Sequence, residues 1–231
     1  MKKLIVNADD FGYSQGVNQG VIEAHVKGIV TSTSLMVNGK AVNGAVRLIK
    51  NQPELSLGLH FAFVDVQGRL LKLGEIEGRP IPVAGVGMEL QAQLEKFKML
   101  VGRVPDHLDS HYDVHAMPGF YPYFKKAAKE LGVPLRDGGK IKFISSFFGR
   151  SKPTGRGEDN LDKISAQSLL DLLHNLPDGV SELMCHPGYV TPDLESSYSF
   201  QREMELKALT DPRIKAFIEK EGIQLINFSQ I

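Results

Sequence analysis

The sequence predicts an α/β protein built around a parallel sheet. About seven short β-rich segments alternate with longer segments whose apolar residues recur at helical spacing. No internal repeat, low-complexity tract or long hydrophilic hinge divides the 231 residues. Titratable residues also follow several of the expected strands at the same end. At this length the alternation fits either a doubly wound open sheet or a (β/α) barrel, complete or incomplete.

The elements of the N-terminal half follow from local signals. Lys3–Val6 is a short aliphatic strand that runs into a loop at Asn7–Gly12. Ser14 is a suitable N-cap for a helix through His25, and Gly28 stands where a glycine ends a helix. Periodicity then predicts a strand at Ile29–Val37, a helix at Ala41–Lys50, a strand at Leu55–Phe63, a helix at Glu89–Val101 and a strand at Asp106–Ser110.

The C-terminal half repeats the alternation with one interruption. Gly138–Asn160 mixes glycine, lysine, serine and arginine, and we expect it to be a loop insertion in a single domain spanning residues 1–231. The other segments are a helix at Tyr121–Leu131, a strand at Val133–Arg136, a helix at Ala166–Leu176, a strand at Glu182–His186, a loop at Pro187–Ser199, helices at Phe200–Leu209 and Asp211–Lys220, and a closing strand at Gln224–Phe228.

Composition argues against nucleic-acid and membrane partners and favours a cytoplasmic location. Lysine plus arginine and aspartate plus glutamate number 27 each, and the calculated pI is about 7.1, which argues against a surface for nucleic acid. Cys185 is the only cysteine, so no intrachain disulfide can form and a reducing cytoplasm is expected. The N-terminus lacks a signal-peptide core and no apolar run is long enough for a bilayer, so no membrane partner is expected.

Polar residues gather at one end of the expected strands. His60, His111 and His186 stand at or just after the C-terminal end of a strand, and so do Asp9-Asp10 and Arg136. In both candidate folds these strand ends meet at one edge, where active sites form. The distribution therefore predicts a functional site at that edge.

The neighbouring carboxylates Asp9 and Asp10 fit two different roles. Adjacent side chains of an extended segment point apart, so one carboxylate can bind a metal while the other faces a substrate. The alternative is a solvated turn in which an aspartate caps the following helix and Gly12 supplies the bend.

Asp10, His60 and His111 form a candidate metal site. One carboxylate and two imidazoles make the facial triad that first-row divalent metals accept, with coordination positions left for water and substrate. His60 alone also fits a buried structural histidine, and the segment His107–His115 also fits a solvated loop. His115 can rejoin the site only if the chain turns helically after His111.

His186 and Arg136 complete the candidate catalytic set. The pKa of a histidine near neutrality suits a general acid, and His186 faces the expected mouth whereas Cys185 faces the wall. Arg136 could neutralise and orient a carboxylate such as Asp9, and the alternative is a surface ion pair that contributes little to stability.

Taken together, these segments resemble the YdjC-like carbohydrate deacetylases, the chitooligosaccharide (diacetylchitobiose) deacetylase family. The resemblance covers nearly the whole chain, and its motifs are Val6–Gly12, Gly28–Ser34, Gly58–Phe61, His107–His111 through His115, Leu135-Arg136 and Met184–Gly188. The sequence departs from the more histidine-rich version of the fourth motif, because Tyr112 and Asp113 separate His111 from His115.

The resemblance implies a fold, an activity and roles for residues. The implied fold is a distorted TIM-like (β/α) barrel with about seven parallel strands, commonly in a homodimer. The implied activity is metal-dependent removal of N-acetyl groups from small N-acetylglucosamine-containing oligosaccharides, phosphorylated or not. His60 and His111 match the metal ligands with Asp10 as the carboxylate ligand, Asp9 matches the base and His186 the acid.

Two matters stay open at this point. The family favours magnesium, whereas two imidazoles suit Zn²⁺, Co²⁺ or Mn²⁺ better on ligand softness. A metal-dependent phosphoesterase acting on sugar phosphates would use similar ligands, and a non-catalytic sugar-binding protein would need neither Asp9 nor His186.

Overall fold

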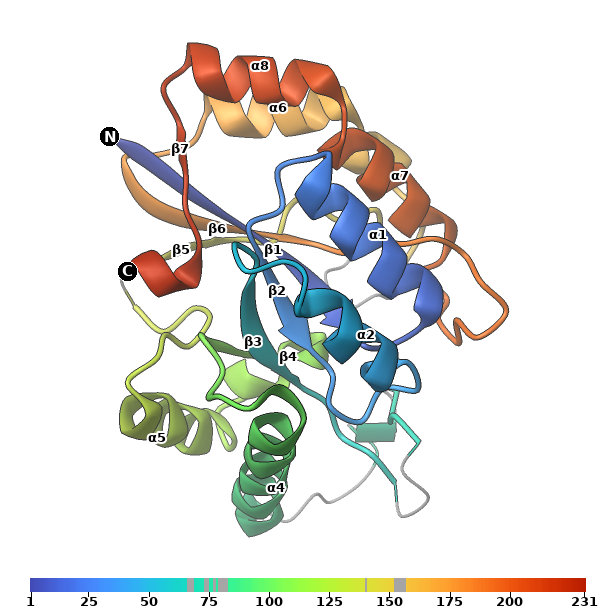
Figure 1. Ribbon diagram of the computed structural model, residues 1–231, viewed down its shortest axis with the longest axis vertical. Coiled ribbons are helices and arrows are strands. Elements are labelled where there is room, and N and C mark those ends of the chain that lie inside the picture. The colour runs from blue at the N-terminus through green and yellow to red at the C-terminus, as the bar shows by residue number, and fades with distance from the viewer. Residues whose placement is uncertain (66–68, 73–74, 77, 79–82, 140, 152–156) are drawn as a thin grey trace.

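A computed structural model describes the chain except residues 66–68, 73–74, 77, 79–82, 140 and 152–156. Its centre is one parallel sheet with the strand order β4-β3-β2-β1-β6-β5, and β7 also pairs with β1 (Figure 1). The strands are β1 (Lys2–Phe11), β2 (Ser32–Leu35), β3 (Ser56–Phe61), β4 (Leu108–Ser110), β5 (Lys142–Ile144), β6 (Gly179–Cys185) and β7 (Gln224–Leu225).

The sheet curls into part of a barrel, consistent with the expected distorted TIM-like fold. β1 lies at its centre and pairs with β6 on one side from Lys2 onward. On its other side β7 pairs near Lys3 and β2 pairs from Asn7 onward. All pairings among these strands are parallel, so the C-terminal ends of β1, β3, β4 and β6 face the same way.

Helices surround the curved sheet and bury its outer face (Figure 1). Ser14 caps α1 by accepting a hydrogen bond from the Val17 amide, as its position in the sequence predicts. The helices are α1 (Gln15–Val26), α2 (Val42–Ile49), α4 (Val83–Val101), α5 (Tyr121–Leu131), α6 (Ala166–His174), α7 (Phe200–Leu209) and α8 (Pro212–Lys220), with short 3₁₀ helices η1 (His111–Ala116), η2 (Leu161–Ile164) and η3 (Phe228–Gln230).

Several elements differ from the expectations. β1 continues through Phe11 instead of ending at Val6, because its residues from Leu4 onward are buried and paired. The expected strand Val133–Arg136 is reduced to an isolated parallel bridge between Leu135 and Leu108. The expected loop 138–160 contains β5, which extends the sheet beyond β6, although residues 140 and 152–156 of this segment lie outside the described part.

The expected closing strand also differs in extent. β7 has only two residues, and Phe228 begins η3, where Asn227 caps the turn. Within the residues that the structure describes, no helix combines the length and apolarity needed to traverse a bilayer.

Candidate active site

An irregularity in β1 lets two successive carboxylates enter one site. The register against β2 shifts between Ala8 and Phe11, and Asp10 adopts a left-handed backbone with φ of 67°. Aspartate tolerates this conformation better than most residues. Neighbouring side chains of a regular strand point to opposite faces. Here both carboxylates lie near His60, and both are almost completely buried.

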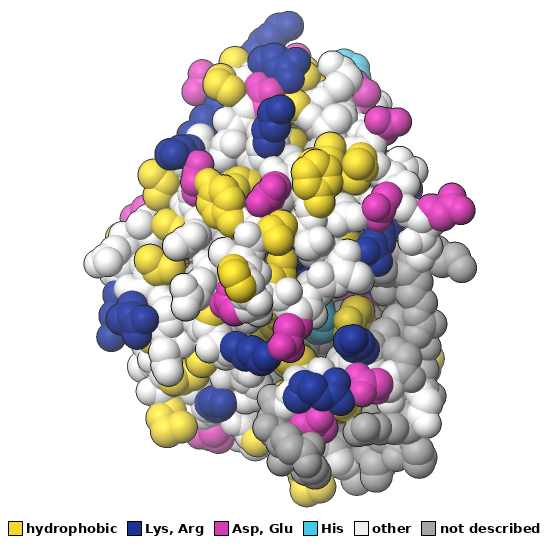
Figure 2. Space-filling view, turned by 90° about the vertical axis from the view of Figure 1, so that its right-hand side faces the viewer, with side chains coloured by type: hydrophobic (Ala, Val, Ile, Leu, Met, Phe, Trp, Pro, Cys, Tyr) yellow, Lys and Arg dark blue, Asp and Glu magenta, His cyan; other side chains and the backbone are white. Residues whose placement is uncertain are grey.

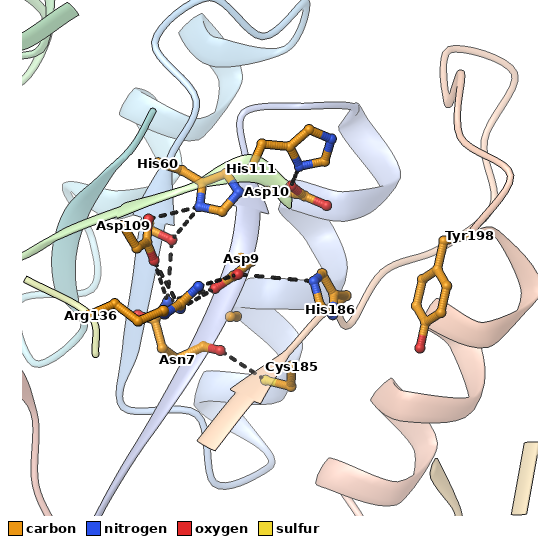
Figure 3. A network of polar contacts seen from close by, with 12 residues as sticks. Asn7, Asp9, Asp10, His60, Asp109, His111, Arg136, Cys185, His186 and Tyr198 are labelled. Carbon is orange, nitrogen blue, oxygen red and sulfur yellow. Dashed lines mark hydrogen bonds and ion pairs between the residues drawn. The ribbon is translucent and has the colours of Figure 1, made fainter. Parts of the chain in front are cut away.

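Asp10, His60 and His111 converge as the sequence predicts. Asp10 Oδ1 lies 3.3 Å from His60 Nε2 and 3.0 Å from His111 Nδ1, and the ligand atoms of the three residues all lie within 4.8 Å of one another. Figure 3 shows both imidazoles facing the Asp10 carboxylate. His60 comes from the end of β3, and His111 begins η1 directly after β4.

The donor atoms of this group fit a divalent cation. Asp10 Oδ1 and His60 Nε2 are buried and lack hydrogen-bond partners among the described residues. Two ligands that each lie about 2.1 Å from one ion are roughly 3.0–3.4 Å apart, which is the spacing seen here. His60 Nδ1 is bound to Asp109 at 2.8 Å, and this contact directs Nε2 toward Asp10.

A second group, Asp9, His60 and Asp109, also has the composition of a metal site. Its carboxylates already bind the Arg136 guanidinium, with contacts of 2.7 Å to Asp9 and 2.9 Å to Asp109. A cation placed there would face that fixed positive charge. Asp10, His60 and His111 are therefore the better candidates for a cation site.

The charges around Asp10 and His60 set their protonation. Burial alone would raise the pKa of Asp10, but His111 and Arg202 hold that pKa well below its usual range. Burial alone would lower the pKa of His60, whereas Asp109 and Asp10 raise that pKa to about 10. Because both carboxylates attract positive charge toward His60, the same environment favours a metal ion.

Arg136 is buried and contacts three carboxyl groups. Its two terminal nitrogens contact both Asp9 oxygens at 2.7 Å, one of them also reaches Asp109, and Nε donates to Glu182 at 2.8 Å. The bidentate pair with Asp9 is the contact that the sequence suggested, and the alternative of a surface ion pair is wrong because Arg136 is 1% exposed. Asn7 also donates to Asp9, at 2.8 Å.

His186 lies on the opposite side of Asp9, with its Nε2 4.0 Å from Asp9 Oδ2 (Figure 3). The Glu205 carboxylate accepts a hydrogen bond from the backbone amide of His186, and its other oxygen lies 3.8 Å from His186 Nδ1. Tyr198 donates its hydroxyl hydrogen to the same carboxylate. Burial opposes protonation of His186, but Glu205 raises the pKa of this histidine above its usual value.

The remaining histidines and the cysteine do not join the cation site. The chain does turn after His111, but His115 packs inward, its Nδ1 2.7 Å from Ser110 Oγ, and burial lowers its pKa to about 4. His107 stacks on Phe228 with ring centroids 3.8 Å apart. Cys185 is buried, as expected, and donates to the Asn7 carbonyl.

These groups open into a cavity of about 720 Å³, a size typical of small-molecule sites. Asp9, His60, His111 and His186 all line it. Figure 2 looks onto this region, where a histidine is visible in a hollow between acidic and basic side chains. The cavity therefore gives a ligand access to both the cation-binding group and Asp9.

Sequence reasoning missed the contribution of α7. Arg202 donates to Asp10 Oδ2 at 2.6 Å, and Glu205 holds His186, yet neither residue follows a strand. A signal for both existed. Arg202 and Glu205 precede Leu206 and Leu209 at helical spacing, so these charges continue the buried stripe of the helix.

The fold is the one shared by carbohydrate esterases of known structure. A family 4 carbohydrate esterase from Streptomyces lividans, solved with acetate, superposes with a TM-score of 0.59 over 98% of this chain and 91% of the other, at 13% identity. A crystal structure from Enterococcus faecalis, whose name refers to cleavage of cellobiose phosphate, has a TM-score of 0.85 and 28% identity over 99% and 98% of the two chains.

The chain belongs to the YdjC-like protein family, whose model matches residues 3–220. A carbohydrate deacetylase of Brevibacillus brevis is 38% identical over 99% of both chains. A carbohydrate deacetylase of Geobacillus stearothermophilus is 37% identical over 98% of this chain and 96% of its own length.

Proposed function

We propose that this protein is a carbohydrate deacetylase that hydrolyses N-acetyl groups of small N-acetylglucosamine-containing oligosaccharides, with or without a phosphate. The observation that carries the proposal is the convergence of Asp10, His60 and His111 beside a buried carboxylate and a histidine in one cavity. The full-length relatives named carbohydrate deacetylase support the same activity.

Asp10, His60 and His111 are proposed to hold one divalent ion. When bound, such an ion supplies Lewis-acid polarisation of a carbonyl and lowers the pKa of a coordinated water. Magnesium follows from the family resemblance, whereas the two imidazoles suit Zn²⁺, Co²⁺ or Mn²⁺. Asp109 and Ser34 contact His60 Nδ1 and keep Nε2 available for the ion.

Asp9 and His186 are proposed to move the protons. Asp9 accepts a proton from the attacking water, and Arg136 orients its carboxylate and stabilises its charge. His186, whose pKa is raised by Glu205, donates a proton to the sugar nitrogen as the C–N bond breaks. Without that donation an amide anion would leave, so loss of His186 should reduce the rate roughly 10²–10⁴-fold.

The deciding experiment is acetate release from N,N′-diacetylchitobiose and from its phosphate. The protein is stripped of metal and reloaded with Mg²⁺, Zn²⁺, Co²⁺ or Mn²⁺ in separate assays. We expect acetate release only after reloading. Release of phosphate without acetate would instead favour a phosphoesterase, and binding without either product would favour a sugar-binding protein.

Two variants separate the proposed roles. His186→Ala should retain metal but lose turnover, whereas His60→Ala should lose both, as measured by metal content and acetate release. Normal metal content and turnover in His60→Ala would refute the ligand assignment.

Further proposals concern the organisation of the protein. A single connected sheet supports one domain over residues 1–231. A homodimer follows from the family resemblance, and the lone buried cysteine is compatible with a cytoplasmic location. Sedimentation and fractionation of the native protein would test these two properties.

A further inference from the structure

The chain takes an unusual path directly after His111. Tyr112 and Asp113 are consecutive residues in the left-handed region, with φ of 57° and 52°. Non-glycine residues rarely adopt this conformation, and two in succession are rarer still. As a result Tyr112 and Asp113 both line the cavity, whereas Val114 and His115 return to the buried interior.

Within the described part of the chain, no hydrogen bond or ion pair joins the Asp113 carboxyl to another residue. The nearby Arg136 is already engaged, because its three nitrogens contact Asp9, Asp109 and Glu182. A partly buried carboxylate without protein donors is costly unless a ligand or water supplies them.

We propose that Asp113 determines sugar specificity by accepting hydrogen bonds from hydroxyl groups of the ring bound in the cavity. A carboxylate has two oxygens and can accept hydrogen bonds from two neighbouring hydroxyl groups, and a sugar ring offers several such donors. Asp113 lines the same cavity as His60, His111 and His186, so the sugar it would contact is bound in the cavity that holds the candidate cation site. This inference rests on the proposed deacetylase function.

Asp113→Asn is the first test, because asparagine has nearly the same size and tolerates the left-handed backbone. Loss of a charge-assisted hydrogen bond should raise KM for N,N′-diacetylchitobiose roughly tenfold or more, while kcat changes less than about threefold. Hydrolysis of p-nitrophenyl acetate, which has no sugar, should be unaffected. Asp113→Gly, which removes the side chain and suits the backbone, should show the same pattern.

Asp137→Asn is the matched control. Asp137 also has a left-handed backbone, with φ of 55°, but its side chain is exposed and does not line the cavity. This variant should keep the wild-type KM and kcat, and metal content should be equal in all variants.

The outcomes separate this inference from the function on which it rests. Wild-type acetate release combined with an unchanged KM in Asp113→Asn and Asp113→Gly would overturn the role of Asp113 alone. A fall in kcat at constant KM would also overturn it, because that pattern indicates a role in the reaction step. Absence of acetate release from the wild type would overturn the proposed function and, with it, the sugar ligand named here.

Discussion

Glu182 in β6 provides a sharp test of how charge is arranged beneath the site. Its side chain is 1% exposed and accepts from Arg136 Nε at 2.8 Å. Arg136 also binds Asp9 and Asp109, so one guanidinium serves three buried carboxyls. Burial outweighs the attraction of Arg136 and raises the pKa of Glu182 from 4.5 to about 7.

This raised pKa makes the folded state hold a proton that the unfolded state releases. Stability associated with Glu182 is therefore present below pH 4.5 and is lost as the pH rises through about 7. The full loss is about 3 kcal/mol, because each pKa unit corresponds to about 1.4 kcal/mol. This loss is a large fraction of the roughly 5–15 kcal/mol by which a folded domain is usually stable.

Glu182→Gln should remove this dependence. The glutamine can still accept a hydrogen bond from Arg136 Nε. Its amide does not titrate, so its contribution to the free energy of unfolding does not vary with pH. The difference in free energy of unfolding between variant and wild type should therefore change by roughly 2–3 kcal/mol in favour of the variant when the pH is raised from 5 to 8.

The assay is urea denaturation of metal-stripped wild type and variant at several pH values. Glu219→Gln is the control, because Glu219 is an exposed glutamate of α8. Its difference from wild type should stay constant with pH. A constant difference for Glu182→Gln as well, or one that turns against the variant at pH 8, would refute the reasoning.

Three other perturbations test separate features. Glu205 raises the pKa of His186, so Glu205→Gln should move the alkaline loss of kcat/KM to lower pH. Glu203→Gln, on the same helix, is the control and should leave the pH profile unchanged. An unchanged profile in Glu205→Gln, or the same shift in both variants, would contradict this prediction. Burial raises the pKa of the Cys185 thiol, so a thiol reagent should modify this residue only when the protein unfolds. Rapid labelling of the native protein would contradict this prediction. Ser14→Ala should reduce the free energy of unfolding by about 1 kcal/mol in urea denaturation, because the Val17 amide loses its cap.

Local sequence signals were sufficient for several parts of the fold and site. Ser14 marks the start of α1, since capping depends on a side chain and an amide three residues away. His60, His111 and His186 could be grouped because parallel strands carry their C-terminal ends to one edge. The prediction that Asp10 shares their site needed no more than that topology.

Contacts set by tertiary packing were beyond the same reasoning. Helical spacing predicts α7 and places Arg202 on its buried stripe, but which neighbour that stripe meets depends on how the helices pack, so the contact between Arg202 and Asp10 was missed. Val133–Arg136 has strand composition, yet only Leu135 finds a partner, in Leu108. β5 was missed because its three residues gain their order from pairing with β6 and lack a strong pattern of their own.

The irregular register of β1 has a mechanical consequence. Asp9 and Asp10 are joined through one peptide bond, so the separation of their carboxyl groups is governed by covalent geometry, the two backbone dihedrals that flank that bond and the side-chain torsions. His186, in contrast, follows a different strand, and its 4.0 Å separation from Asp9 varies with any sliding of β6 against β1. When the sheet flexes, the two carboxylates therefore travel as a unit, and the histidine is the part whose alignment changes.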